Sequence, residues 1–189
     1  RDDTLIACTQ LPPPPPPGKR GDLVDPALVQ LLPGVREGMH RLQAAGFTLV
    51  VVSNQGLVAR GAGDLETVER VNQALRIQLG FTWLSCYYCP FHPQGTVPRW
   101  TREHEWRKPG EGMFLAAAAD LAIDLASSWM IGDAARDMEA AAAAGMPVEH
   151  CLRVKVPHVK DDAGEGDFSW AVSKVLSSQP LMNTLVHAR

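Results

Sequence analysis

The feature that most constrains the fold of this chain is an alternation of short apolar runs with amphipathic or alanine-rich segments. Residues 47–52 form an almost wholly apolar run, as expected of a strand that is buried on both faces. Helical patterns lie between such runs, and alternating strands and helices favour a parallel sheet covered on both sides. We therefore predict the α/β fold class, with a doubly wound, Rossmann-like parallel sheet.

Capping and turn residues mark the boundaries of the predicted elements. Asp64 is a typical N-cap and Gly80 a typical stop, which together predict a helix from about residue 64 to residue 79. Gly46 and Gly145 end two further helices in the same way. The predicted helices cover residues 35–45, 64–79, 113–125, 136–144 and 168–176, and the predicted strands cover residues 47–52, 82–88, 128–131 and 148–154.

The composition limits the class of protein. The 189 residues, 46% of them apolar, predict a single domain over 1–189 with a full hydrophobic core. A net charge of −3 argues against nucleic acid or a membrane surface as partner. The four cysteines are too few and too unevenly spaced for a disulfide framework, so we predict a reducing, cytoplasmic location. We also predict a monomer.

Six consecutive prolines, Pro12 to Pro17, cannot join the interior of a sheet or a helix. We predict that residues 11–20 form a stiff surface loop in the polyproline II conformation. A ligand for a proline-binding module is the alternative, but no flanking recognition pattern supports it.

Three polar residues stand either just after an apolar run or at the start of the chain. Asp2 stands at the chain start, Ser53 follows residues 47–52, and Asp133 follows residues 128–131. In a doubly wound sheet the carboxyl ends of the strands gather such residues at one edge. An acid, a hydroxyl and a second acid, with Lys108 as the cation, are the groups that phosphoryl transfer to an aspartate requires.

In sequence order these residues resemble the motifs of the haloacid dehalogenase superfamily of aspartyl-phosphate phosphatases. Within it the chain is similar to the phosphatases of D-glycero-D-manno-heptose 1,7-bisphosphate and, more distantly, to the histidinol-phosphate phosphatases. The resemblance implies the haloacid dehalogenase type of sheet, and the short connections predict no large cap domain. The segments that carry it are 31–35, 53–61, 87–90, 107–109 and 132–133.

The first motif of this family reads Asp-x-Asp-x-Thr, and Asp2 and Thr4 match its last two fixed positions. The resemblance then places the nucleophilic aspartate immediately before Arg1, at the end of a central strand. We therefore expect the sequence to be a fragment of a longer protein. An alternative register makes Asp2 the nucleophile, although it mismatches the spacing to the threonine.

The resemblance also implies a role for each catalytic residue. Asp2 would protonate the leaving oxygen and then deprotonate the attacking water. Ser53 would donate a hydrogen bond to the phosphoryl group, and Lys108 would neutralise its charge. Mg2+ would be held by the nucleophile, the carbonyl of Asp2 and Asp133, with Asp137 one helical turn further on in the metal site or orienting its water.

Four residues are expected to contact the substrate in the heptose-phosphate enzymes. Arg107 and the Asn54-Gln55 pair are the main candidates, whereas Arg60 is a weaker one that would otherwise anchor its loop. In isolation, Ser53 and Asp2 could equally act as a helix cap and a turn residue, and Asp137 could serve only as a favourable charge at a helix N-terminus.

The chain departs from the family pattern at several positions. Asp3 replaces the usual Gly and brings a negative charge near an anionic site, and Ala134 stands where relatives often carry Lys. Relatives often hold a structural zinc through four side chains, but Phe91 and Trp106 occupy two of those positions here, and neither can bind zinc. Structural zinc is not expected, and these two rings should pack instead. A rearranged site is the alternative, formed by Cys86, Cys89, His92 and His104.

We therefore predict a phosphatase that depends on magnesium and hydrolyses a small sugar-phosphate ester, most similar to heptose bisphosphate, through an aspartyl-phosphate intermediate. The place of such an enzyme is carbohydrate metabolism. The alternatives are a histidinol-phosphate phosphatase, a polynucleotide 3'-phosphatase, which the acidic balance disfavours, and a non-catalytic relative that binds phosphate ligands or a protein.

Overall fold

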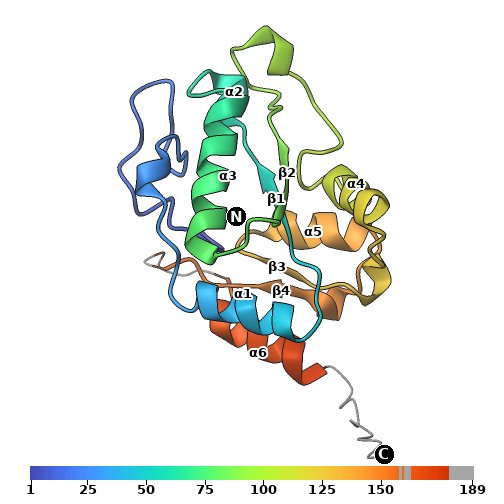
Figure 1. Cartoon of the computed structure of the whole chain (residues 1–189). Coiled ribbons are helices and arrows are strands. Elements are labelled where there is room, and N and C mark those ends of the chain that lie inside the picture. Colours follow the sequence, from blue (N-terminus) through green and yellow to red (C-terminus); the bar gives the residue numbers. More distant parts are fainter. Residues whose placement is uncertain (158, 160–162, 179–189) are drawn as a thin grey trace, which may run out of the picture.

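The computed structural model describes residues 1–157, 159 and 163–178, so the last part of the predicted domain, 179–189, lies outside the described residues. Strands run through the interior and helices pack around them (Figure 1). The elements are η1 (Pro26–Leu28), α1 (Val35–Ala44), β1 (Val50–Asn54), α2 (Leu57–Arg60), α3 (Leu65–Leu79), β2 (Ser85–Cys89), η2 (Pro98–Trp100), α4 (Gly112–Leu121), η3 (Leu125–Ser127), β3 (Met130–Gly132), α5 (Ala135–Ala143), η4 (Val148–His150), β4 (Cys151–Arg153) and α6 (Phe168–Ser178).

Both pairs of strands within the described residues are parallel, as the alternation of strands and helices predicts. β1 pairs with β2, from Val50 opposite Ser85 to Asn54 opposite Cys89. β3 pairs with β4, from Met130 opposite Cys151 to Gly132 opposite Arg153. The sheet is therefore present as two parallel pairs, β1–β2 and β3–β4, with α1 packed against α6 and α5 packed against β3 and β4 (Figure 1).

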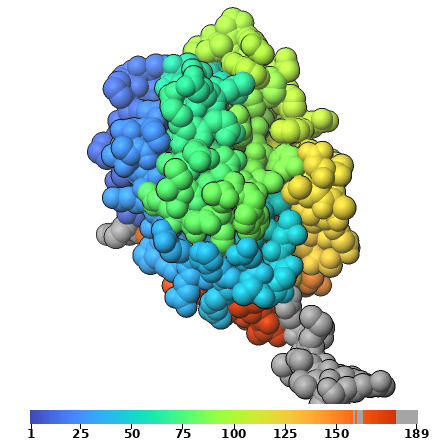
Figure 2. All heavy atoms as spheres, in the orientation of Figure 1, coloured from blue at the N-terminus to red at the C-terminus, as the bar shows by residue number. Residues whose placement is uncertain are grey.

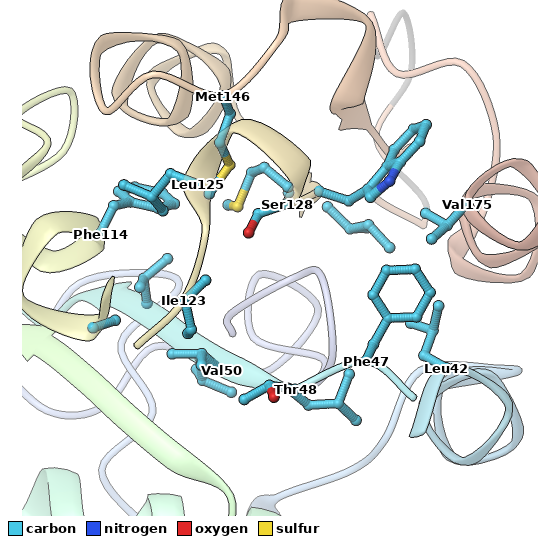
Figure 3. A pocket seen from close by; sticks show the side chains of 18 of the residues that line it. Leu42, Phe47, Thr48, Val50, Phe114, Ile123, Leu125, Ser128, Met146 and Val175 are labelled. Carbon is cyan, nitrogen blue, oxygen red and sulfur yellow. The ribbon is translucent and has the colours of Figure 1, made fainter. Parts of the chain in front are cut away.

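A cavity of about 570 Å3 separates the two pairs. Its lining includes residues of both strands that border it, Val50 to Val52 of β1 and Met130 to Gly132 of β3. Apolar side chains from both sides point into it, among them Phe47, Phe114 and Val175 (Figure 3). The cavity thus has the lining expected of a slot for one further buried strand.

The buried Arg1 lies at this cavity, together with Thr4 and Leu5.

The helix boundaries follow the capping residues closely. Asp64 accepts a hydrogen bond from the N–H of Thr67 at 2.7 Å, and Gly80 ends α3 in the left-handed conformation, at φ 80°. Gly46, just after the end of α1, also has a positive φ, 89°. The predictions for these helices are confirmed, because their stop signals are local properties of the chain.

The predicted strands are too long at their amino-terminal ends. Residues 47–49 line the cavity and have no partner strand there, so β1 begins only at Val50. Residues 148–150 form η4 instead of the first part of β4. The predicted helix over 113–125 ends at Leu121, because Ala122 adopts a left-handed φ of 52° and the chain turns into η3.

The proline run lies outside helices and strands, and its polyproline II conformation stays a prediction. Five of the prolines from Pro12 to Pro17 are exposed, and the segment lies at one flank of the molecule, in the darkest blue of Figure 2. Among the helices of the described residues, none has the length and apolar character that a crossing of a lipid bilayer demands.

Candidate active site

The amino-terminal residues form a tight loop that holds the carboxylate of Asp2. The N–H of Leu5 donates to the carbonyl of Arg1 at 2.8 Å, and the N–H of Asp3 donates to the carbonyl of Ile6 at 2.8 Å. The Asp2 carboxylate accepts from Arg1 Nε at 2.8 Å and from Gln55 Nε2 at 2.7 Å. Burial alone would raise the pKa of Asp2, but the Arg1 guanidinium, the positive charge of the α-amino group of Arg1 and the hydrogen bonds from Arg1 and Gln55 lower it to about 2.

Asp3 stands where the family usually has Gly, and backbone donors bind its side chain. Its φ is 53°, in the left-handed region where the family's Gly would be at ease and where Asp is tolerated better than most residues. Its Oδ1 accepts hydrogen bonds from the N–H groups of Cys8 and Thr9, both at 2.9 Å. Asp3 therefore closes the loop, and its charge is bound by two backbone donors.

Thr4 joins the amino-terminal loop to the end of β3. Its hydroxyl donates to Asp133 Oδ1 at 2.8 Å, which brings together residues 129 positions apart in the sequence. Burial raises the pKa of Asp133 and the nearby charge of Asp137 raises it further, while the hydrogen bond from Thr4 opposes them. Asp133 is thus a carboxylate whose surroundings disfavour its charge.

Lys108 and Asp137 form a buried ion pair beside Asp133. Lys108 Nζ lies 2.7 Å from Asp137 Oδ1 and also donates to the carbonyl of Val52 at 3.0 Å. Burial opposes the ionisation of Asp137, but the charge and hydrogen bond of Lys108 lower its pKa. The second oxygen, Oδ2, accepts from the N–H of Ala134 at 3.1 Å, so Asp137 also caps the start of α5.

The end of β1 holds both Lys108 and the amino-terminal loop in position. Asn54 exchanges two hydrogen bonds with the backbone of Lys108, donating to its carbonyl at 2.9 Å and accepting from its N–H at 3.0 Å. The buried Ser53 accepts from Gln55 Nε2 at 2.8 Å, and its hydroxyl lies 3.5 Å from Asp2 Oδ2. The structure therefore brings Asp2, Ser53, Lys108, Asp133 and Asp137 into one connected site.

Arg60 and Arg107 lie on the rim of this site rather than within it. Arg60 forms an ion pair with Asp22, which anchors the loop before η1, as the plainer sequence alternative proposes. Arg107 donates to the carbonyl of Phe91 at 3.2 Å. A side chain at Gly56 would lie within 3.4 Å of both guanidinium groups and of the His92 ring, so this glycine permits the three groups to converge. Burial and the two arginines lower the pKa of His92, so the positive charge there comes from Arg60 and Arg107.

The region predicted to lack zinc is packed with rings. The Phe91 and His104 rings are stacked, with centroids 4.1 Å apart, and Trp100 meets Phe91 edge-on at 5.1 Å. Arg102 lies 4.2 Å above the Phe91 ring. Trp106 packs against the core cluster that contains Phe91. Stacking on Phe91 directs His104 into ring packing, in line with the proposed apolar replacement of the family's zinc site.

The donor set fits a hard divalent cation at Asp133 only if further ligands join it. Within the described residues, no group of three or more His, Cys, Asp or Glu side chains is arranged to hold a metal ion. A raised pKa at Asp133 is the signature of a carboxylate that a cation would stabilise, and carboxylate oxygen is a ligand that Mg2+ prefers. Asp137, by contrast, already has partners for both of its oxygens.

Two residues of the site were missed in the sequence analysis. Arg1 is buried and bridges Asp2 and Asn72, donating to Asn72 Oδ1 at 2.8 Å. Arg153 Nε donates to the carbonyl of Asp133 at 2.9 Å. A charged residue inside a fixed-spacing motif was the available signal for Arg1, and a charge at the end of the predicted strand 148–154 was the signal for Arg153.

The fold and this site, with an acid, a hydroxyl, a buried lysine and a paired acid at the ends of parallel strands, define an enzyme that handles phosphate esters. A family model described as HAD-hydrolase-like matches residues 105–150. The D-glycero-beta-D-manno-heptose-1,7-bisphosphate 7-phosphatase of Escherichia coli O6:H1 is 37% identical over 142 residues, covering 74% of this chain and 75% of that protein. The enzyme of the same name from Vibrio cholerae is 38% identical over 131 residues, 68% of this chain and 70% of that protein.

Two solved structures share the fold. A phosphatase-like protein of Mesorhizobium loti gives a TM-score of 0.74 at 25% identity, over 94% of this chain and 83% of that one. The heptose bisphosphate phosphatase of B. bronchiseptica, solved with magnesium and phosphate, gives 0.73 at 22% identity, over 95% and 96%. The chain therefore belongs to the phosphatase family of these relatives, within the haloacid dehalogenase superfamily. The predicted Rossmann-like α/β fold class and the phosphatase assignment are confirmed.

Proposed function

We propose that the protein hydrolyses a sugar-phosphate monoester through an aspartyl-phosphate intermediate. The observation that carries the proposal is the hydrogen bond from Thr4 to Asp133 at 2.8 Å, because it joins the first motif to the second acidic motif. With Lys108 buried at the same place, these residues supply the acid, cation and carboxylate that such a transfer requires.

We further propose that the nucleophile is an aspartate joined directly to Arg1. The cavity between β1 and β3 supports this, since it is lined by apolar side chains and by the free edges of two parallel strands. An extended apolar segment ending at Arg1 would pair with both edges and complete one continuous sheet. The burial of one more strand would stabilise the fold by roughly 25 cal/mol per Å2 of apolar surface removed from water.

The other residues act around that aspartate. Asp2 first has to take up a proton, which it then donates to the leaving oxygen, and the resulting carboxylate later accepts one from the attacking water. The Ser53 hydroxyl and the Lys108 ammonium bind the phosphoryl oxygens, and Asp137 holds Lys108 in place through their 2.7 Å ion pair. Asp133 and the carbonyl of Asp2 are the groups of this chain that would hold Mg2+, which supplies positive charge against the phosphoryl group when bound.

A heptose bisphosphate is the substrate that the relatives' names support. Such a substrate carries a second anionic group, and Arg60, Arg107 and His92 converge beside Gly56 at the rim of the site. We propose that Arg107 in particular binds this second group, since Arg60 is already paired with Asp22. A monomer in a reducing compartment such as the cytoplasm fits the four unpaired cysteines.

The experiment uses the full-length protein, and first determines the residues that precede Arg1. We expect an apolar run that ends in Asp. Phosphate release is then measured with Mg2+ on heptose bisphosphate, other sugar phosphates and histidinol phosphate, beside a variant with Asn at the nucleophile position. Release that requires the Asp, and is fastest for the bisphosphate, supports the proposal. An upstream segment without that pattern, or no turnover of any ester, would leave the non-catalytic alternative.

A further inference from the structure

Gln55 holds a position between β1 and α2 that keeps its side chain away from solvent. Its N–H donates to the carbonyl of Cys89 at 2.7 Å, and its carbonyl accepts from the N–H of Val58 at 3.2 Å. The residue is 2% exposed. A side chain so enclosed, on a backbone tied to both β2 and α2, has little freedom to reach a substrate.

The side-chain amide of Gln55 connects Asp2 and Ser53, two proposed catalytic residues from different segments of the chain. Both hydrogens of Nε2 are used, one on Asp2 Oδ2 at 2.7 Å and one on Ser53 Oγ at 2.8 Å. An ionised carboxylate can only accept, so the amide must present its nitrogen to Asp2. One amide group therefore sets the relative positions of residues that lie 51 apart in the sequence.

The hydrogen bonds also determine what each catalytic group can still do. Arg1 Nε and Cys8 Sγ lie 2.8 Å and 3.3 Å from Asp2 Oδ1. On the other side, Arg1 Nη2 lies 3.4 Å from Oδ2, so Gln55, at 2.7 Å, gives Oδ2 its shorter hydrogen bond. Ser53 Oγ accepts from Gln55, which leaves its own hydrogen to donate. Its contact with Asp2 Oδ2 is at 3.5 Å, the limit of a hydrogen bond, so that hydrogen remains available for a phosphoryl oxygen.

We infer that Gln55 is a positioning residue that aligns Asp2 and Ser53 for phosphoryl transfer and does not itself bind the substrate. This inference rests on the proposed function, and it differs from the substrate contact that the sequence resemblance implies for Gln55. Misplacement of reacting groups by about 1 Å can cost about 100-fold in rate, so a supporting residue can matter as much as a contact.

The test compares Gln55→Leu with Gln43→Leu in the full-length protein. Gln43 lies exposed near the end of α1 and receives the same chemical change. The kinetic parameters kcat and KM are measured on two substrates. One is a sugar phosphate, whose leaving group needs a proton, and the other is p-nitrophenyl phosphate, whose leaving group does not. Gln55→Glu is a second variant, which keeps the size of the side chain but replaces the donors by a charge that repels Asp2.

Positioning predicts that Gln55→Leu lowers kcat on the sugar phosphate by about 10- to 100-fold with KM nearly unchanged. The loss on p-nitrophenyl phosphate should be smaller, because Asp2 contributes less there. Gln55→Glu should be at least as damaging. A rise in KM at constant kcat would overturn the inference in favour of substrate contact, as would kinetics equal to those of Gln43→Leu. If the unsubstituted protein hydrolyses no ester, the proposed function fails, and this role of Gln55 fails with it.

Discussion

Asp2 and Asp133 belong to one site but lie in opposite electrostatic surroundings. Asp2 receives hydrogen bonds from a guanidinium and an amide, and its pKa is held at about 2. Asp133 receives one hydrogen bond, from Thr4, while burial and the charge of Asp137 raise its pKa. No ion pair to Asp133 is formed by any residue of the described part of the chain.

The difference separates a carboxylate that its own neighbours stabilise as an anion from one whose surroundings disfavour its charge. Asp2 is stabilised as an anion by its own neighbours, so it must take up a proton before it can serve as the proposed general acid. Asp133 is destabilised as an anion until positive charge arrives, which is the property expected of a metal ligand. Asp137 is the intermediate case, since Lys108 supplies its positive charge from within the chain.

The largest expected effect comes from removing the cationic partner of the buried Asp137 carboxylate, which leaves it without an ion pair, like Asp133. Lys108→Met removes the cation and leaves a buried charge, which should lower the free energy of unfolding by about 3–5 kcal/mol. Urea denaturation at pH 7 measures the change. Adding Asp137→Asn to Lys108→Met removes the stranded charge and should recover much of the loss. A loss below about 1 kcal/mol in the single variant would contradict the buried pair.

A second test concerns the loop that supports Asp2. Asp3→Ala removes the acceptor of two backbone N–H groups and places Ala at a left-handed φ, so we expect a loss of about 2–4 kcal/mol. Asp3→Asn is the matched control, because Asn tolerates that backbone conformation and keeps one acceptor oxygen. Thermal unfolding of both variants provides the measurement, and equal midpoints for Ala and Asn would show that neither effect operates.

The third test uses pH to isolate Asp2. Its pKa is lowered from 3.8 to about 2 on folding, so its ionised form stabilises the fold. That contribution is complete above pH 4 to 5 and is lost as pH falls through 2, amounting to about 2 kcal/mol. Denaturation midpoints between pH 5 and pH 2 should therefore fall less steeply in Asp2→Asn than in the unsubstituted protein. Identical slopes would show that Asp2 does not contribute to the pH dependence of stability.

The smallest expected effect has the opposite sign. Asp133→Asn relieves an unfavourable buried charge and keeps the acceptor for Thr4, so without divalent ions stability should rise, by up to about 1 kcal/mol. Mg2+ at ten times its dissociation constant should stabilise the unsubstituted protein by about 1.4 kcal/mol and leave Asp133→Asn unchanged. Calorimetric unfolding with and without Mg2+ decides the matter. Equal Mg2+ stabilisation of both proteins would remove the metal role of Asp133.

Local signals in the sequence predicted the elements whose ends are local. Asp64 and Gly80 bound α3 because a cap and a left-handed stop act on their own backbone. Residues 47–49 are apolar enough for a strand but lie outside β1, because pairing depends on a neighbouring strand and not on the segment itself. The order of acidic, hydroxyl and basic motifs likewise predicted which residues would meet, although the partners within the site were not predictable from spacing.

The sequence alone determined the class of chemistry, since an acid, a serine, a lysine and a second acid at the ends of strands can be recognised from type and order. Only the tertiary structure decided how charge is distributed among them. Arg1 and Gln55 bind Asp2, Lys108 binds Asp137, and Asp133 is left with Thr4. The physical reason is that pKa values depend on burial and on distances of a few ångströms between residues far apart in the chain, which residue order does not encode.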